Sequence, residues 1–164
     1  MDQRFDLILE MADREFEGDS LNGPSLMRTL DSVGAAEAAS TRTYEGYSAW
    51  ETALHCAYYK YLIARGLGGG AELEPYPFAK GNFPPIPRDA GADEWQKARD
   101  FLRLAHSSCM AAIRAASPER LDGVFAAWEM SFRHAVSWLC THDIYHNAQI
   151  RSMGLPSLKH PKES

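Results

Sequence analysis

The sequence predicts an all-α fold, and three observations predict it. Apolar residues recur at three-and-four spacing in several segments of helical length. No segment shows the period-two run of β-branched residues that is typical of a strand. One connection dense in glycine and proline, residues 66–91, interrupts the helical pattern. With 164 residues, 45% of them hydrophobic, the chain is long enough for one core and short for two, so we expect a single domain over residues 1–164.

The first arm of the chain predicts a helix in two parts. Residues 2–17 carry apolar side chains at mixed three-and-four spacing and are followed by Gly18, which predicts an amphipathic helix over this range. In "NGPSLMRTLDSVGAA", Pro24 occupies a helix-starting position and Gly34 a stopping position. A second, shorter helical piece is therefore expected between them.

The two middle helices have clear boundaries. Ser48 followed by Glu51 forms a capping box, which predicts a helix over residues 49–65 that ends at a glycine run. Residues 92–116 show helical spacing until Ser117-Pro118 ends the pattern. These two segments supply the second and third long helices.

The last long helix is predicted over residues 131–153, closed by Gly154 and Pro156. Its spacing places several side chains on one broad face. They are His134 or Ala135, Trp138, Leu139, His142, His146, Gln149 and Ile150.

The 26-residue connection 66–91 is longer than compact domains usually use. A parallel arrangement of the flanking helices explains it, because the chain must then return along a bundle roughly 30 Å long. We expect Tyr76, Phe78 and Phe83 to fasten this crossover to the bundle. The alternative is a lid that covers a substrate.

Composition excludes several classes of partner. A net charge of −5 without a basic run argues against nucleic acid and against an acidic membrane surface. No apolar stretch has the length of a membrane span, and the acidic N-terminal segment is unlike a signal peptide. Cys56, Cys109 and Cys140 are odd in number and lie in apolar helical patterns, which favours buried free thiols. We therefore expect a cytoplasmic protein.

Histidines provide the candidate metal site. His142 and His146 are four positions apart, so on a helix they share one face with Cβ atoms roughly 6 Å apart. His55 lies within the predicted helix 49–65. If that helix packs against the last one, the three imidazoles meet and leave coordination positions open for water or substrate.

Residues beside this trio are candidates for supporting roles. Ligating histidines usually donate their second N–H to a carboxylate or carbonyl, which makes Asp143, Tyr145, Asn147 and Gln149 candidates. Gln149 is the best of them because it lies one turn from His146 on the inward face. The alternative is that Gln149 fills a polar gap while Asp143 and Asn147 face solvent.

Other polar residues have two interpretations each. Glu51, one turn before His55, suits a general base or a supporting group, and its capping-box role explains it equally well. His106 and His134 are interpreted as core or surface histidines, and His160 as an exposed residue of the tail. Cys56 points about 100° away from His55 on a helix and is interpreted as packing.

Three motifs together resemble the DinB/YfiT superfamily of metal-binding four-helix bundles. Gly23-Pro24-Ser25-Leu26 lies in the first arm, Tyr47-Ser48-Ala49-Trp50-Glu51 leads to His55, and His142-Asp143-Ile144-Tyr145-His146-Asn147-Ala148-Gln149-Ile150 lies near the end. The match covers residues from about 23 to 156 in the family's order. Ala148 departs from the glycine that the family often has there, whereas the acidic residue after the first histidine is present as Asp143.

The resemblance implies an up-down-down-up four-helix bundle with a long crossover between helices two and three. It implies a divalent metal (nickel, zinc, iron or manganese) on His55, His142 and His146, and a homodimer. Three neutral imidazoles leave the full charge on such a metal, so a bound thiol or water loses its proton more readily. We therefore expect a small-molecule substrate, such as a low-molecular-weight thiol, and a thiol S-transferase or a hydrolase. The alternative is a non-catalytic metal-binding or stress-related helical dimer.

Overall fold

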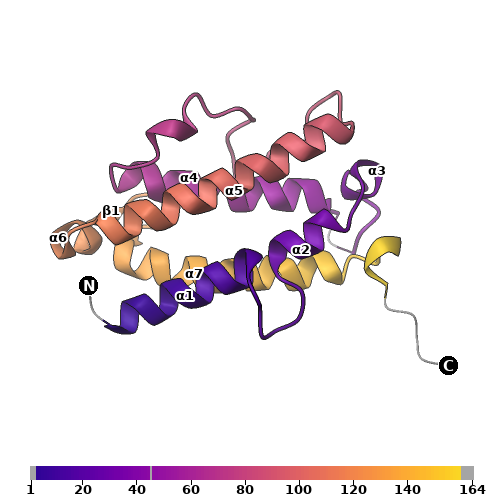
Figure 1. The fold of residues 1–164 in the computed structure, drawn as a ribbon. Helices are drawn as coiled ribbons and strands as arrows, with labels where there is room; N and C mark the ends of the chain where they lie inside the picture. The colour runs from indigo at the N-terminus through magenta and orange to yellow at the C-terminus, as the bar shows by residue number, and fades with distance from the viewer. Residues whose placement is uncertain (1–2, 45, 160–164) are drawn as a thin grey trace.

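Four long helices form the body of the protein in the computed structural model, which describes residues 3–44 and 46–159 (Figure 1). They are α1 (Gln3–Glu17), α4 (Ala49–Gly66), α5 (Ala92–Ala115) and α7 (Phe132–Arg151). For residues 3, 4 and 140 the structure describes the backbone alone. The main elements are helical, as predicted, and the four long helices begin and end within two residues of the predicted bounds.

Short elements join the long helices. Leu26–Asp31 forms α2, Ala35–Ala38 forms α3, Pro118–Asp122 forms α6, and two 3-10 turns, η1 and η2, cover Ala71–Leu73 and Pro156–Leu158. The helical piece expected up to Gly34 ends earlier, at Asp31. Its N-cap is Ser25, whose hydroxyl accepts from the backbone N–H of Arg28, so Pro24 lies before the helix rather than in it.

Helix α4 is the central element of the core. It packs against both α5 and α7, while α1 packs against α7 and α2. Trp50 of α4 meets Trp95 of α5 with ring centroids 5.1 Å apart, and both rings are almost fully buried. The indole N–H of Trp95 donates to the carbonyl of Val33 at 2.8 Å, which satisfies a polar group that burial would otherwise penalise. A helix apolar on nearly all sides therefore holds His55 inside the bundle.

The connection between α4 and α5, residues 67–91, lies along the outside of that helix pair (Figure 1). Tyr76 is buried and its ring centroid lies 5.2 Å from that of Phe101. Phe78 packs on the same residue at 5.6 Å. Phe83 instead stacks on the His55 ring, with centroids 4.2 Å apart. Tyr76 and Phe78 thus fasten the crossover to α5. Phe83, later in the same connection, packs on His55, a predicted metal ligand.

A small β-hairpin that the sequence did not predict precedes α7. Strands β1 (Val124–Phe125) and β2 (Met130–Ser131) pair antiparallel, with Phe125 opposite Met130. The turn between them contains Trp128 and Glu129, and Glu129 has φ 52°, a left-handed conformation that few residues other than glycine adopt. Strands of two residues are too short to show alternation, so periodicity could not reveal them.

No helix within residues 3–44 and 46–159 is both long enough and apolar enough to cross a bilayer.

Candidate metal site

Three histidine side chains from two helices meet in the bundle. His55 comes from α4, and His142 and His146 come from successive turns of α7. The Nε2 atom of His142 lies 2.9 Å from that of His55 and 3.2 Å from that of His146. The candidate ligand atoms of all three lie within 4.8 Å of one another. The four-residue spacing aligns the α7 pair, and the packing of α4 on α7 adds the third ring.

Hydrogen bonds to the outer nitrogens orient two of the rings. The Nδ1 atom of His55 lies against the backbone carbonyl of Asn82, in the 67–91 connection. The Nδ1 atom of His146 lies 2.7 Å from the side-chain oxygen of Gln149. Because both partners accept hydrogen bonds, each Nδ1 must carry the proton, which we assign from the network. The Nε2 atoms of His55 and His146 are then lone pairs directed at the shared centre.

This donor set fits a divalent ion. The Nε2 lone pairs of His55 and His146 both face Nε2 of His142, so one cation placed among the three nitrogens can bind all of them. Metal–nitrogen bonds of about 2.0–2.1 Å place ligand nitrogens about 2.9 Å apart at a right angle and about 3.4 Å apart at a tetrahedral angle. The two closest Nε2 pairs, at 2.9 and 3.2 Å, fall in this range. Imidazole suits zinc, nickel, iron and copper alike, so geometry does not choose among them.

Burial keeps two of these imidazoles neutral. It lowers the pKa of His55 from 6.5 to about 4, although the hydrogen bond with Asn82 opposes the shift. Burial also lowers the pKa of His142 to about 2, and the neighbouring His146 and His55 lower it further. Neutral imidazole is the form that binds metal ions. These rings are therefore in their ligating form throughout the neutral pH range.

A buried ion pair lies directly behind the histidines. The Lys60 ammonium donates to Asp143 at 2.6 Å, and both side chains are at most 1% exposed. Burial by itself would lower the pKa of Lys60, but the charge of Asp143 and the hydrogen bond raise it above its ordinary value. The predicted alternative of a solvated Asp143 is therefore wrong: the carboxylate neutralises a lysine in the core.

A second group of potential ligands shares His142. Candidate atoms of Cys56, His142 and Asp143 also lie within 4.8 Å of one another. Burial raises the pKa of the Cys56 thiol well above its usual value, and the charge of Asp143 adds to the shift. A protonated thiol is a poor ligand, and Asp143 is already paired with Lys60. The three-histidine group is therefore the better metal site, and Cys56 keeps its packing role.

The other predicted neighbours have distinct positions. Asn147 is buried, and its amide donates to the carbonyl of Pro24 at 2.7 Å, so the predicted solvated position is wrong for it too. Tyr145 is 62% exposed, and its ring centroid lies 5.1 Å from that of His146 in an edge-on arrangement. Of the four candidates, Gln149 is the one whose side chain reaches a site histidine directly.

Glu51 is engaged at the start of α4. Its carboxylate accepts from the backbone N–H of Ser48 at 2.8 Å and from the Ser48 hydroxyl at 2.9 Å. The hydroxyl in turn accepts from the Glu51 backbone N–H at 3.1 Å, which confirms the predicted capping box. Within the described part of the chain, the Glu51 carboxylate thus binds Ser48 and not a site histidine, so its general-base role stays a prediction.

The remaining histidines and cysteines lie elsewhere. His106 stacks on Phe16 at 3.7 Å, and its Nε2 lies 2.9 Å from an oxygen of Asp13. His134 is exposed at the start of α7. Cys56 and Cys109 are buried free thiols, as predicted. His160 and the Cys140 side chain lie outside the described part of the chain.

An aromatic pocket of about 400 Å³ opens on the candidate site. His55 and His142 form part of its wall. The other lining residues are Tyr59, Trp128, Met130 and Trp138. The sequence placed Trp138 on the inward face of its helix, whereas this side chain is 63% exposed. Trp128 and Met130 were not singled out because they belong to the unpredicted hairpin, and Tyr59 because one aromatic residue beside a histidine is a weak signal.

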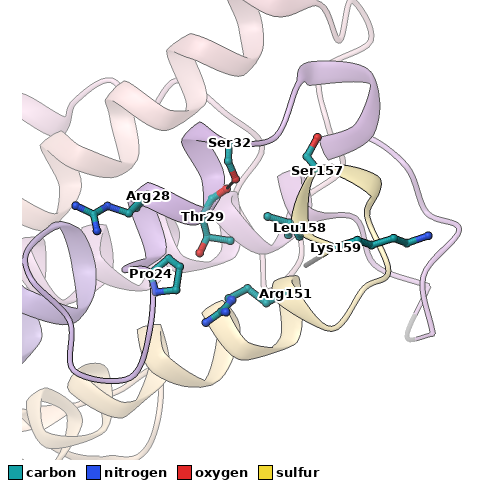
Figure 2. A pocket seen from close by; sticks show the side chains of 8 residues that line it. All are labelled: Pro24, Arg28, Thr29, Ser32, Arg151, Ser157, Leu158 and Lys159. Atoms are coloured by element: carbon teal, nitrogen blue, oxygen red, sulfur yellow. Dashed lines mark hydrogen bonds between the residues drawn. The ribbon is translucent and has the colours of Figure 1, made fainter. Parts of the chain in front are cut away.

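A second hollow, of about 190 Å³, lies where α2 meets the end of α7 (Figure 2). Basic side chains contribute to its lining, which suggests an anion site. Figure 2 shows the Arg28 and Lys159 side chains extending in opposite directions. The backbone N–H and hydroxyl of Ser157 donate to Glu37. Because the charged heads of Arg28 and Lys159 do not converge, this hollow is not a built anion site.

The family model of the DinB superfamily matches residues 24–150, a range that includes all three site histidines. No curated protein and no solved structure matches the chain.

Proposed function

The chain belongs to the DinB superfamily, and from this membership and its three converging imidazoles we propose that it is a divalent-metal-dependent enzyme. His55, His142 and His146 are the proposed ligands. The proposed reaction is either transfer of a low-molecular-weight thiol or hydrolysis of an amide or ester. The proposed metal is nickel, zinc or iron, which imidazole ligands suit, or manganese, which the family resemblance implies.

The observation that carries the proposal is the meeting of three Nε2 atoms, with the outer Nδ1 atoms of His55 and His146 held by other groups. The Asn82 carbonyl and the Gln149 side chain fix the tautomers of His55 and His146. Buried histidines that served the core alone would pair with ordinary donors and acceptors, as His106 does with Asp13. Here two Nε2 lone pairs and the Nε2 atom of His142 meet at one centre instead, which favours a cation.

A bound divalent ion lowers the pKa of a thiol or water that binds it and so supplies a nucleophile at neutral pH. The protein's own side chains do the rest. Gln149 holds His146 in its ligating tautomer, and Phe83 covers the His55 ring. The aromatic pocket reaches His55 and His142 and gives a small molecule access to the site. Glu51 is proposed as a base on its position alone, one turn before His55.

The order of the helices and the assembly belong to the same proposal. An up-down-down-up order is supported by Figure 1, where α4 and α5 both begin beside α3 and α1 and α7 run alongside each other. A homodimer and a cytoplasmic location stay predictions that follow from the family resemblance and from the free thiols.

One observation favours a second function, a non-catalytic metal-binding module. Glu51, one turn before His55, is committed to the helix cap. Asp143 is committed to Lys60 in the core. Among the described residues, then, neither carboxylate is positioned to move a proton at the candidate site.

Elemental analysis tests the metal first. The protein, expressed without added metal, is compared with His142→Ala and with His134→Ala, which removes an exposed histidine instead. We expect near-stoichiometric divalent metal in the wild type and in His134→Ala, and its loss in His142→Ala. Full metal content in the His142→Ala variant would overturn the proposed site.

Activity separates the two functions. The metal-loaded protein is assayed with small thiols and a generic electrophile, and separately with amide and ester substrates. Turnover that disappears in His142→Ala supports the enzyme. Stoichiometric metal without turnover on either panel would support the binding module instead.

A further inference from the structure

The aromatic pocket beside the histidines is built from three separate segments. Tyr59 lies one turn after His55 on α4, and Trp138 lies one turn before His142 on α7. Trp128 is supplied by the turn of the hairpin. The spacing of four places each of these two aromatic residues on the same helix face as a histidine of the site. A volume of about 400 Å³ is within the range of small-molecule sites.

Trp128 is the middle of this wall. Its ring centroid lies 5.0 Å from that of Tyr59 and 6.4 Å from that of Trp138. It also lies 6.3 Å from the centroid of His142. Phe125 meets Trp128 edge-on at 5.3 Å and supports it from the hairpin. The indole is thus fixed over the candidate site, with its neighbours in the range of favourable aromatic contacts.

Trp138 lies on the exposed side of α7: its side chain is 63% exposed, and that of Tyr145, two turns later, is 62% exposed. The neighbours of Trp138 one position away, Ser137 and Leu139, are half-buried and buried. Apolar surface exposed to water at the mouth of a pocket is unfavourable. A bound apolar group that covers it removes this cost.

The charge of the pocket narrows the ligand class. Among the lining side chains none is Lys, Arg, Asp or Glu. A phosphate or carboxylate group at the outer wall, away from the proposed metal, would therefore find no counter-ion among the lining side chains. A cationic group would find aromatic faces but would also approach the +2 charge of the proposed metal. A neutral group with a flat apolar surface avoids both costs.

We propose that Tyr59, Trp128 and Trp138 select a substrate that carries a neutral aromatic ring next to the atom that reaches the metal. This inference rests on the proposed function and names its substrate class. The rings determine affinity and specificity, and the histidines hold the ion. Tyr59 is further held in place because its hydroxyl donates to the Asn82 side chain at 3.0 Å.

Calorimetric titration with three matched thiols tests the proposal. The probes are phenylmethanethiol, its para-carboxylate and its para-trimethylammonium derivative, each added to the metal-loaded protein. We expect the neutral thiol to bind at least about tenfold more tightly than either charged one. Equal affinity for the three would overturn the inference while leaving the metal site intact.

Variants place the binding in this pocket. Trp138→Ala and Trp128→Ala should each weaken binding of phenylmethanethiol about tenfold. Tyr44→Ala, which removes an exposed ring that does not line the pocket, should leave the dissociation constant unchanged. Metal content is measured in every sample, so loss of metal is distinguished from loss of ring recognition. Unchanged affinity in both tryptophan variants at full metal content would overturn the proposal.

A metal-free readout keeps the test independent of catalysis. Phenylmethanol, which lacks the thiol, is titrated into metal-free protein and should still bind less well to Trp138→Ala than to the wild type. Sedimentation of the same two proteins tests the alternative that a second copy of the chain covers the exposed Trp138. A dimer that Trp138→Ala dissociates, with no change in phenylmethanol binding, would overturn the proposal and assign Trp138 to an interface.

Discussion

Single hydrogen bonds decide how the site histidines are presented. Gln149 accepts from His146 at 2.7 Å and so holds one Nε2 lone pair toward the centre. The sequence placed Gln149 correctly because a spacing of three on a helix brings two side chains together. It placed Asp143 and Asn147 less well, because spacing shows which face a residue occupies but not what packs over that face.

Replacing Gln149 with Leu should weaken metal binding. The change removes the acceptor while retaining most of the volume, so the His146 tautomer is no longer fixed. Loss of such a partner typically lowers metal affinity about 10–100-fold. Competition with a chromophoric chelator measures the affinity. Gln149→Glu retains an acceptor and is the matched control. Identical affinities in the Leu variant and the wild type would contradict the role.

Breaking the buried pair between Lys60 and Asp143 should destabilise the fold strongly. Lys60→Met leaves the Asp143 carboxylate without its partner in the core, and we expect a loss of about 3–5 kcal/mol in the free energy of unfolding. The double variant Lys60→Met with Asp143→Leu removes both charges and should recover most of that loss. Urea denaturation of the metal-free proteins measures both. A single variant as stable as the wild type would show that the pair contributes nothing.

At the scale of elements, local sequence patterns were enough for the long helices and insufficient for what lies between them. Helices α5 and α7 bury apolar side chains every third or fourth residue, whereas α4 is buried on nearly all sides and is marked by its capping box and the glycines after it. The hairpin and the 67–91 connection contain no period. Their contacts, Trp128 over Tyr59 and Phe83 over His55, join residues far apart in the chain. Such contacts depend on the packing of the whole bundle and could not be predicted locally.

The start of α4 offers a test that separates capping from chemistry. Ser48→Ala removes the hydroxyl that accepts from the Glu51 backbone, and we expect it to lower the free energy of unfolding by about 1 kcal/mol. Because His55 lies in the second turn, metal stoichiometry should not change. Chemical denaturation and elemental analysis of one preparation give both values. Loss of metal at unchanged stability would instead tie the cap to the site.

At the scale of the whole molecule, four elements meet around His106, which is buried between them. Its ring contacts Asp13 of α1, while the charges of Lys60 on α4 and Asp143 on α7 act on it. Burial lowers the pKa of His106, the Lys60 charge lowers it further, and the hydrogen bond with Asp13 opposes the shift. The histidine is therefore largely neutral in the folded protein at pH values where it is protonated in the unfolded chain.

This shift predicts the direction of a pH effect on stability. Above about pH 6.5 His106 is neutral in both states and contributes no pH dependence. As the pH falls below that value, the unfolded chain takes up a proton that the folded protein does not, so stability decreases toward the lowered pKa of the folded state. His106→Gln should remove up to about 1.4 kcal/mol per pH unit from this slope. Urea denaturation of metal-free protein between pH 7 and 5 measures it, and equal slopes would contradict the prediction.

The separation of the imidazole cluster along the chain also orders events during synthesis. His55 emerges from the ribosome 87 residues before His142. At typical translation rates this interval lasts roughly 4–17 s. Throughout it, the nascent chain contains only one of the three site histidines and cannot assemble the trio. Ion capture therefore follows production of nearly all of the described chain, and the ion that is plentiful at that moment has the first opportunity to bind.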